Sequence, residues 1–203
     1  MRTIAITPPG ALRRAAPLAA AAGWELEPSP DGHTEADDAA LATGEPLLVV
    51  PPQARVARRL RRILVVHEGS PLVAPAVELA DEAALQSGAE IVVLHAASAS
   101  RPRAPGSLPA PRFVDHSGYD WAEWRAEFLR RFCRCSEGLC VNLEVAVGQP
   151  AVAVPAALPR LRPDLVIATW KGQAGAGRGR LIRLLLREAS SPVLVLREPT
   201  SPK

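Results

Sequence analysis

The feature that most constrains the fold is an alternation of short apolar runs with helical segments, which begins near Arg62. Residues 63–66 and 91–94 are apolar and rich in β-branched side chains, a pattern typical of strands covered on both faces. Between them, Ser70 and Pro71 indicate a helix start, and Gly88 indicates its end. These residues predict a strand–helix–strand unit of about 30 residues, with Ser70 as a helix cap.

The same alternation continues to the end of the chain. We expect a loop over residues 97–118, followed by a helix over 119–135, a strand over 143–147, a helix over 150–161, a strand over 164–169, a helix over 179–190 and a strand over 192–197. Pro155 and Pro159 predict that the helix over 150–161 is kinked or partly irregular. Because crossovers are right-handed, the pattern favours a doubly wound α/β fold with a five-stranded parallel sheet of order 3-2-1-4-5.

The first 60 residues resemble a shortened copy of this plan. They contain an expected strand over 3–7, a helix over 11–22 and a short strand over 24–26. In addition, residues 45–52 and 191–199 both contain a β-rich run that begins and ends with proline. The hypothesis is a tandem repeat with a truncated first copy, and the alternative is chance similarity. We therefore divide the chain into a degenerate N-terminal αβ segment, 1–60, which packs on the main domain or extends its sheet, and a main domain, 61–203.

Composition restricts the partners and the compartment. The 203 residues carry a net charge of +3, which is too small to indicate nucleic-acid binding, and no apolar run is long enough for a membrane span. Three cysteines between 133 and 140 form no disulfide framework, which fits a reducing compartment. Residues 13–23 mimic a weak signal peptide but contain Pro17. We expect a cytoplasmic protein without nucleic-acid or membrane partners.

Two segments are expected to meet where the strand order reverses, which is where doubly wound sheets bind ligands. One segment is 67–70, after the first strand of the main domain, and the other is 169–180, after the fourth. The second segment has glycines at 172, 175, 177 and 179 and cations at Lys171, Arg178 and Arg180, and it opens a helix. Glycines, cations and a helix N-terminus together suit phosphate groups, although no Walker A motif is present.

Taken together, these segments resemble the universal stress protein family. The matching pieces are residues 63–71, 93–96, 147–150, 164–168, the Gly-rich loop and 191–196. They occur in the family's order and cover about residues 62–198, which is 137 of the 203. The resemblance implies an adenine-nucleotide α-hydrolase-like fold, a homodimer often paired through its last strand, a protein partner that the sequence does not identify, and a role in stress survival.

Many members of this family bind ATP, and the resemblance assigns positions in this chain to that function. Glu68 stands where the family has an Asp near the ribose and adenine, and Thr169 stands where the first loop glycine belongs. Gly172 and Gly179 match the second and third glycines, but the six residues between them are fewer than in the family. Arg180 replaces the Ser or Thr that contacts the terminal phosphates.

The expected ligand is therefore ATP or a related adenine nucleotide such as AMP. The expected binding residues are Val66, His67, Glu68, Ala96, Ala168, Thr169, Lys171, Gly172, Gly175, Gly179 and Arg180. No residue is assigned a catalytic or metal-binding role. The first hypothesis is a nucleotide-binding signalling module, and the second is a dimeric interaction protein that has lost nucleotide binding. A slow nucleotide hydrolase ranks third, because no positioned general base is visible.

Three further groups of residues have more than one interpretation. Trp121, Trp124, Phe128 and Phe132 predict the buried face of a helix, with a partner surface as the alternative. The cysteines at 133, 135 and 140 are expected to be ordinary thiols, with a zinc site including His116 as the alternative. His95 is expected to be a partly buried polar group, with a ligand-binding role as the alternative.

Overall fold

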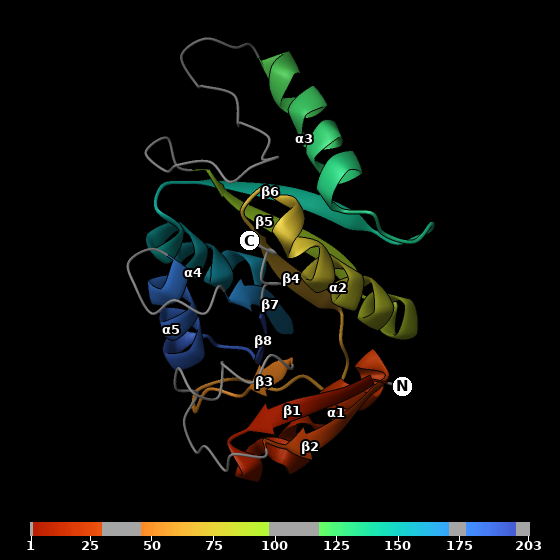
Figure 1. The fold of residues 1–203 in the computed structure, drawn as a ribbon, viewed down its shortest axis with the longest axis vertical. Coiled ribbons are helices and arrows are strands. Elements are labelled where there is room, and N and C mark those ends of the chain that lie inside the picture. Colours follow the sequence, from red (N-terminus) through yellow and green to blue (C-terminus); the bar gives the residue numbers. More distant parts are fainter. Residues whose placement is uncertain (1, 30–45, 98–117, 171–177, 198–203) are drawn as a thin grey trace, which may run out of the picture.

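The computed structural model describes residues 2–29, 46–97, 118–170 and 178–197. The strands are β1 (Arg2–Thr7), β2 (Trp24–Pro28), β3 (Leu47–Val49), β4 (Arg62–His67), β5 (Glu90–Ala97), β6 (Val141–Val147), β7 (Leu165–Trp170) and β8 (Val193–Arg197). Within the described residues they form one eight-stranded sheet of order β2-β1-β3-β8-β7-β4-β5-β6 (Figure 1). The α/β class is as expected, but the prediction of five strands is wrong.

The main domain supplies five of the eight strands. Its strands lie in the order β6-β5-β4-β7-β8, with parallel pairing throughout, which is the predicted 3-2-1-4-5 arrangement. The other three strands come from the N-terminal segment, which extends the sheet at β8. There β3 pairs antiparallel with β8, and Leu48 lies opposite Leu194. The five-strand count failed because it ended the sheet at β8, a strand whose outer edge is open unless another strand covers it.

Helices cover both faces of the sheet. They are η1 (Pro9–Ala11), α1 (Leu12–Ala22), η3 (Pro71–Val73), α2 (Ala74–Ser87), α3 (Gly118–Phe132), α4 (Pro150–Leu161) and α5 (Arg178–Glu188). Buried side chains of α1, α2 and α3 pack on one face, and those of α4 and α5 pack on the other. Within the described part of the chain, no helix has the length and apolar character that crossing a membrane requires.

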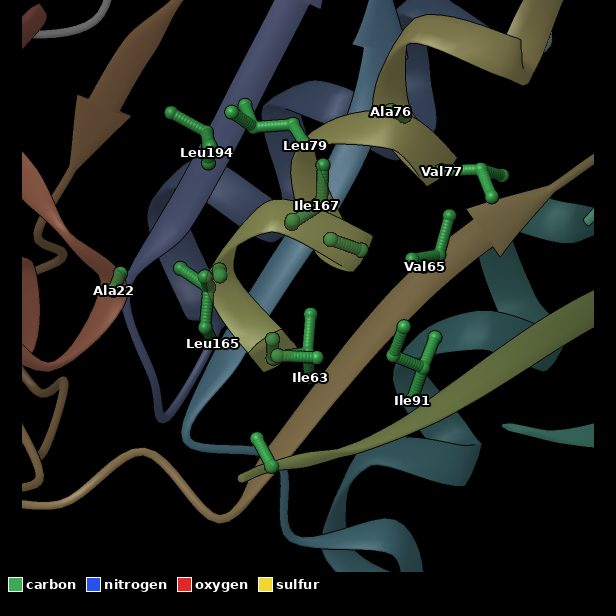
Figure 2. Packing of buried hydrophobic residues seen from close by; sticks show 14 of the residues in the cluster. Ala22, Ile63, Val65, Ala76, Val77, Leu79, Ile91, Leu165, Ile167 and Leu194 are labelled. Carbon is green, nitrogen blue, oxygen red and sulfur yellow. The ribbon is translucent and has the colours of Figure 1, made fainter. Parts of the chain in front are cut away.

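The α2 helix packs on the sheet through buried apolar side chains. Figure 2 shows Ala76, Val77 and Leu79 of α2 lying over side chains of the central strands, such as Val65 and Ile167. All five side chains are at most 2% exposed. Burying one Val, Leu or Ile side chain contributes about 1.5–3 kcal/mol, so this layer anchors the strands that end at the candidate site.

The helix over 150–161 does not have the irregular segment that was one form of its prediction. Despite Pro155 and Pro159, α4 is one continuous element from Pro150 to Leu161. Each internal proline removes one backbone hydrogen bond, which is unfavourable in isolation. However, Val154, Leu158 and Leu161 of α4 are buried in the core shared with α5 and the sheet. Tertiary packing therefore maintains a helix where local sequence predicts an interruption.

The N-terminal segment shares its core with the main domain. Leu18 of α1 and Leu79 of α2 belong to the same cluster of buried residues. At the surface, Arg2 donates two hydrogen bonds to the Glu82 carboxylate of α2, over 2.7 and 3.0 Å. The sequence predicted that this segment packs on the main domain or extends its sheet, and the structure shows both.

Candidate ligand-binding site

The sheet opens at its carboxyl edge between β4 and β7. Pairing between these two strands ends at Val65 opposite Ile167, although both strands continue beyond these residues. The pairing of β4 with β5 extends further, to His67 opposite His95, and the pairing of β7 with β8 extends to Trp170 opposite Arg197. Each strand therefore stays attached to its outer neighbour while the central pair separates. This is the position at which the strand order reverses, where doubly wound sheets bind ligands.

Three of the predicted binding residues lie on one face at this edge. Val66 of β4, Ala96 of β5 and Ala168 of β7 all belong to the layer packed under α4 and α5. Ala168 is 1% exposed, whereas Val66 and Ala96 are half-buried. The structure thus brings three apolar side chains from neighbouring strands to the same side of the sheet, and those of Val66 and Ala96 remain partly exposed there.

Two other predicted residues project to the opposite face, because side chains alternate along a strand. His67 is 1% exposed and Thr169 is 4% exposed. The His67 ring packs against Phe128 and Phe132 of α3, with ring centroids 5.0 and 5.5 Å apart. The imidazole of His67 therefore does not share the side of the sheet that carries Val66 and Ala168.

The turn after β4 carries Glu68 and is stabilised by its own residues. The backbone N–H of Gly69 donates to Nδ1 of His67 over 2.9 Å, and the Ser70 hydroxyl donates to Oε1 of Glu68 over 2.9 Å. Gly69 has φ +79°, a left-handed conformation that favours glycine. Ser70 occupies the N-cap position of η3, as predicted, but its side chain orients Glu68 instead of capping the helix.

A second histidine supports the turn from β5. Nδ1 of His95 lies 2.9 Å from the backbone oxygen of His67. Since that oxygen can only accept, Nδ1 of His95 must carry the proton. Burial lowers the pKa of His95, against smaller raising effects from the His67 backbone and the Glu68 charge. The ring is 6% exposed, so it is more deeply buried than the sequence indicated.

The other side of the opening is the start of α5. Gly179 is buried and Arg180 is exposed, and both lie in the first turn, which contains no acidic residue. Free backbone N–H groups and the helix dipole make such a terminus attractive to anions. Lys171, Gly172 and Gly175, also predicted to bind the ligand, lie outside the described residues.

Sequence reasoning identified the aromatic stripe of α3 but not its contacts. Phe128, Phe132 and Trp124 are at most 8% exposed, as the predicted buried face requires, and Trp121 packs partly buried against the same core. The stripe covers both histidines, and the centroids of Trp124 and Phe128 lie 5.7 and 5.1 Å from that of His95. The helical spacing of the aromatic residues predicted a buried helix face. It did not predict contact with His67 and His95, because a long segment separates β5 from α3.

The three cysteines lie in the segment between α3 and β6. Cys133 is buried, Cys135 is half-buried and Cys140 is exposed. Among the described residues, no group of three or more His, Cys, Asp or Glu side chains is arranged to hold a metal ion. His116, the fourth member of the alternative zinc site, lies outside the described residues.

Comparison with known proteins identifies the relatives of this chain. The universal stress protein family model matches residues 59–197. A universal stress protein from Archaeoglobus fulgidus DSM 4304 has a TM-score of 0.58 at 16% identity, over 98% of this chain and 62% of that one. This chain thus spans less than two thirds of that relative, and at this identity the likeness shows the fold alone.

Two shorter structures cover the main part of the chain. A universal stress protein in complex with cAMP has a TM-score of 0.48 at 17% identity, over 69% of this chain and 99% of that one. A universal stress protein from Archaeoglobus fulgidus in complex with dAMP has a TM-score of 0.40 at 16% identity, over 68% of this chain and 97% of that one. The search of curated proteins found no match.

Proposed function

Because the chain belongs to the universal stress protein family, we propose that it binds an adenine nucleotide, ATP or a relative such as AMP, at the carboxyl edge between β4 and β7. The observation that carries this proposal is the separation of these two strands beyond Val65 and Ile167. Residues that match the family's binding positions flank that opening on both sides, namely Glu68 on the β4 side and Gly179 on the α5 side.

Each flank has chemistry suited to one part of a nucleotide. Val66 and Ala96, which are half-buried, offer an apolar surface for the base. Glu68, oriented by Ser70, accepts hydrogen bonds from ribose hydroxyls. The first turn of α5 attracts the phosphates, and Arg180 contributes a charged contact where the family has a hydroxyl. His67 and Thr169 contribute backbone atoms, since their side chains lie buried on the other face.

The proposed biological role is that of a cytoplasmic stress-response or signalling module without a strong catalytic apparatus. Its partners are a second copy of the chain and a further protein. The outer edge of β8 is already paired with β3, so two copies pair through another surface.

Calorimetry with ATP and AMP on ligand-stripped protein tests the proposal at Glu68. Glu68→Gln removes a charged acceptor, and we expect about a tenfold loss of affinity for both nucleotides. The matched control is Glu78→Gln, which removes an exposed carboxylate from α2 and leaves affinity unchanged. Absence of binding heat from the unmodified protein at tens of micromolar contradicts the proposal.

Arg180 gives a second test, at the phosphate end. Arg180→Ala weakens ATP about tenfold and AMP less, because Arg180 is placed at the terminal phosphates. Arg187→Ala, in the last turn of the same helix, is the matched control and leaves both affinities unchanged. If Arg180→Ala and Arg187→Ala change the affinity for ATP equally, the phosphates do not lie at Arg180.

The second candidate is an interaction protein that has lost nucleotide binding. The shortened spacer before Gly179 and the arginine at position 180 favour it, because both reduce the resemblance to a phosphate cradle. If the unmodified protein, Glu68→Gln and Arg180→Ala all give no binding heat with ATP or AMP, this candidate is favoured over the first.

A further inference from the structure

Two buried histidines end the paired part of β4 and β5. His67 and His95 lie opposite each other in the register of these strands, and they are 1% and 6% exposed. Burying an imidazole is unfavourable unless its nitrogens are hydrogen-bonded, so the contacts of these rings indicate what the pair does.

Both rings bond to the backbone of the turn that carries Glu68. Nδ1 of His67 accepts the N–H of Gly69, and Nδ1 of His95 donates to the carbonyl of His67. The first contact resembles an Asx-turn, in which a side chain accepts an N–H two residues further on. The neutral rings are therefore opposite tautomers, with the proton on Nε2 in His67 and on Nδ1 in His95.

The α3 helix fixes these rings from outside. Phe128 contacts both imidazoles, with centroid distances of 5.0 Å to His67 and 5.1 Å to His95. The turn is also closely packed on this side. A Cβ placed on Gly69 would lie 3.2 Å from Cε1 of His95 and 3.2 Å from Cε2 of Phe128. The rings and the turn therefore have little room to reorient independently.

We propose that His67 and His95 are positioning residues that hold the β4–η3 turn, and so the Glu68 carboxylate, in the conformation that binds the nucleotide. This inference rests on the proposed function. The turn is held at the Gly69 N–H, at the His67 carbonyl and at the Ser70 hydroxyl bonded to Glu68. Removing either imidazole contact frees one side of a glycine-containing turn and lets Glu68 leave its binding position.

Variants at His67 separate hydrogen bonding from packing. His67→Asn keeps an acceptor in the place of Nδ1, as in an Asx-turn, and we expect affinity within about threefold of the unmodified protein. His67→Leu fills the site but accepts no hydrogen bond, and we expect a loss of about tenfold. Equal losses in the two variants, or no loss in either, overturn the role of His67.

Variants at His95 provide the same contrast within the aromatic cluster. His95→Phe preserves aromatic packing against Trp124 and Phe128 but removes the donor to the His67 carbonyl. We expect about a threefold to tenfold loss of affinity, and His95→Asn, which restores a donor, recovers most of it. Urea midpoints of all four variants establish that each is folded at the assay temperature. Full affinity in His95→Phe overturns the role of His95.

Measurements on the ligand-free protein test whether the two histidines fix the turn, independently of nucleotide binding. Nitrogen NMR shows a non-protonated Nδ1 on one histidine and a protonated Nδ1 on the other, if the two tautomers are as assigned. Hydrogen exchange of the Gly69 amide is slow in the unmodified protein and in His67→Asn, and at least about tenfold faster in His67→Leu. If no nucleotide binds but the tautomers and the Gly69 exchange rates are as expected, the proposed function is wrong, and the two histidines still fix the turn. If nucleotide binds but Gly69 exchanges equally in all variants, the positioning role fails.

Discussion

Burial is the largest cause of the shifted pKa values of His95, Cys133 and Cys135. His95 illustrates the effect, because burial lowers its pKa below the ordinary 6.5 despite the neighbouring Glu68 charge. The folded state therefore binds this proton less readily than the unfolded chain does. The His95 contribution to stability is fully present above pH 6.5 and is lost as the pH falls below it.

The first prediction compares stability at two pH values. Between pH 7.5 and 5.5, the unmodified protein loses more of its free energy of unfolding than His95→Phe, which has no titrating group at this position. Urea unfolding followed by tryptophan fluorescence at both pH values measures the two losses. Equal losses contradict the assignment of a lowered pKa to His95.

The three cysteines provide a second prediction at this scale. Burial, and secondarily Cys135, raises the pKa of Cys133 to about 12, and burial with the Asp81 charge raises the pKa of Cys135 to about 11. Since the thiolate is the reactive species, both thiols are almost entirely protonated at pH 8. Iodoacetamide is therefore expected to label the exposed Cys140 at least about tenfold faster than Cys133 or Cys135.

Peptide mass spectrometry over a time course measures these labelling rates. The control is the same reaction in concentrated urea, where the three sites react at similar rates because burial is lost. Labelling of Cys133 as fast as Cys140 in the folded protein contradicts the assignment.

At the scale of elements, glycines end two helices in the same conformation but in different surroundings. Gly23 ends α1 and Gly88 ends α2, each with φ +72°. A Cβ on Gly23 would lie 3.0 Å from Cγ of Gln86 in α2, whereas a Cβ on Gly88 would meet nothing within 4 Å. Gly88 therefore reports only the cost of the left-handed backbone conformation, whereas Gly23 also reports the close approach of α1 to α2.

We expect Gly88→Ala to lower stability by about 1 kcal/mol, which is the cost of a left-handed conformation with a side chain. Gly23→Ala is expected to cost about 0.5 kcal/mol more, because Gln86 must also move. In a Gln86→Ala background this excess disappears, and a double-mutant cycle by urea unfolding measures it. An excess that persists in that background assigns the cost to the backbone alone.

At the scale of the whole molecule, the strands show an approximate symmetry around the β3–β8 pair. Outward from the centre, β3 is followed by β1 and β2, while β8 is followed by β7, β4, β5 and β6. Both β1–β2 and β4–β5 are parallel neighbours joined by a helix, α1 or α2, on the same face. We propose on this basis that residues 1–60 are a truncated first repeat, joined to the second through antiparallel final strands.

The shared core predicts that the molecule unfolds as one unit. Leu18 of α1 is fully buried in the cluster that includes α2 and β4, and Leu18→Ala is expected to cost about 2–5 kcal/mol. Native-state hydrogen exchange then accelerates in β4 and β5 by the same factor as in β1. Acceleration confined to β1 and β2 contradicts a single cooperative unit and supports an independently stable N-terminal segment.

Local sequence was sufficient for the positions and order of the strands of the main domain, because periodicity, helix ends and crossover handedness act over short distances. Residues 63–66 and 91–94 formed strands, and the order β6-β5-β4-β7-β8 followed. Contacts between distant segments decided the rest: β3 covers the edge of β8, packing keeps α4 continuous through Pro155 and Pro159, and α3 buries His67 and His95 against the turn of Glu68. These outcomes depend on which surfaces meet in space, and neighbouring residues carry no record of a partner that lies far away along the chain.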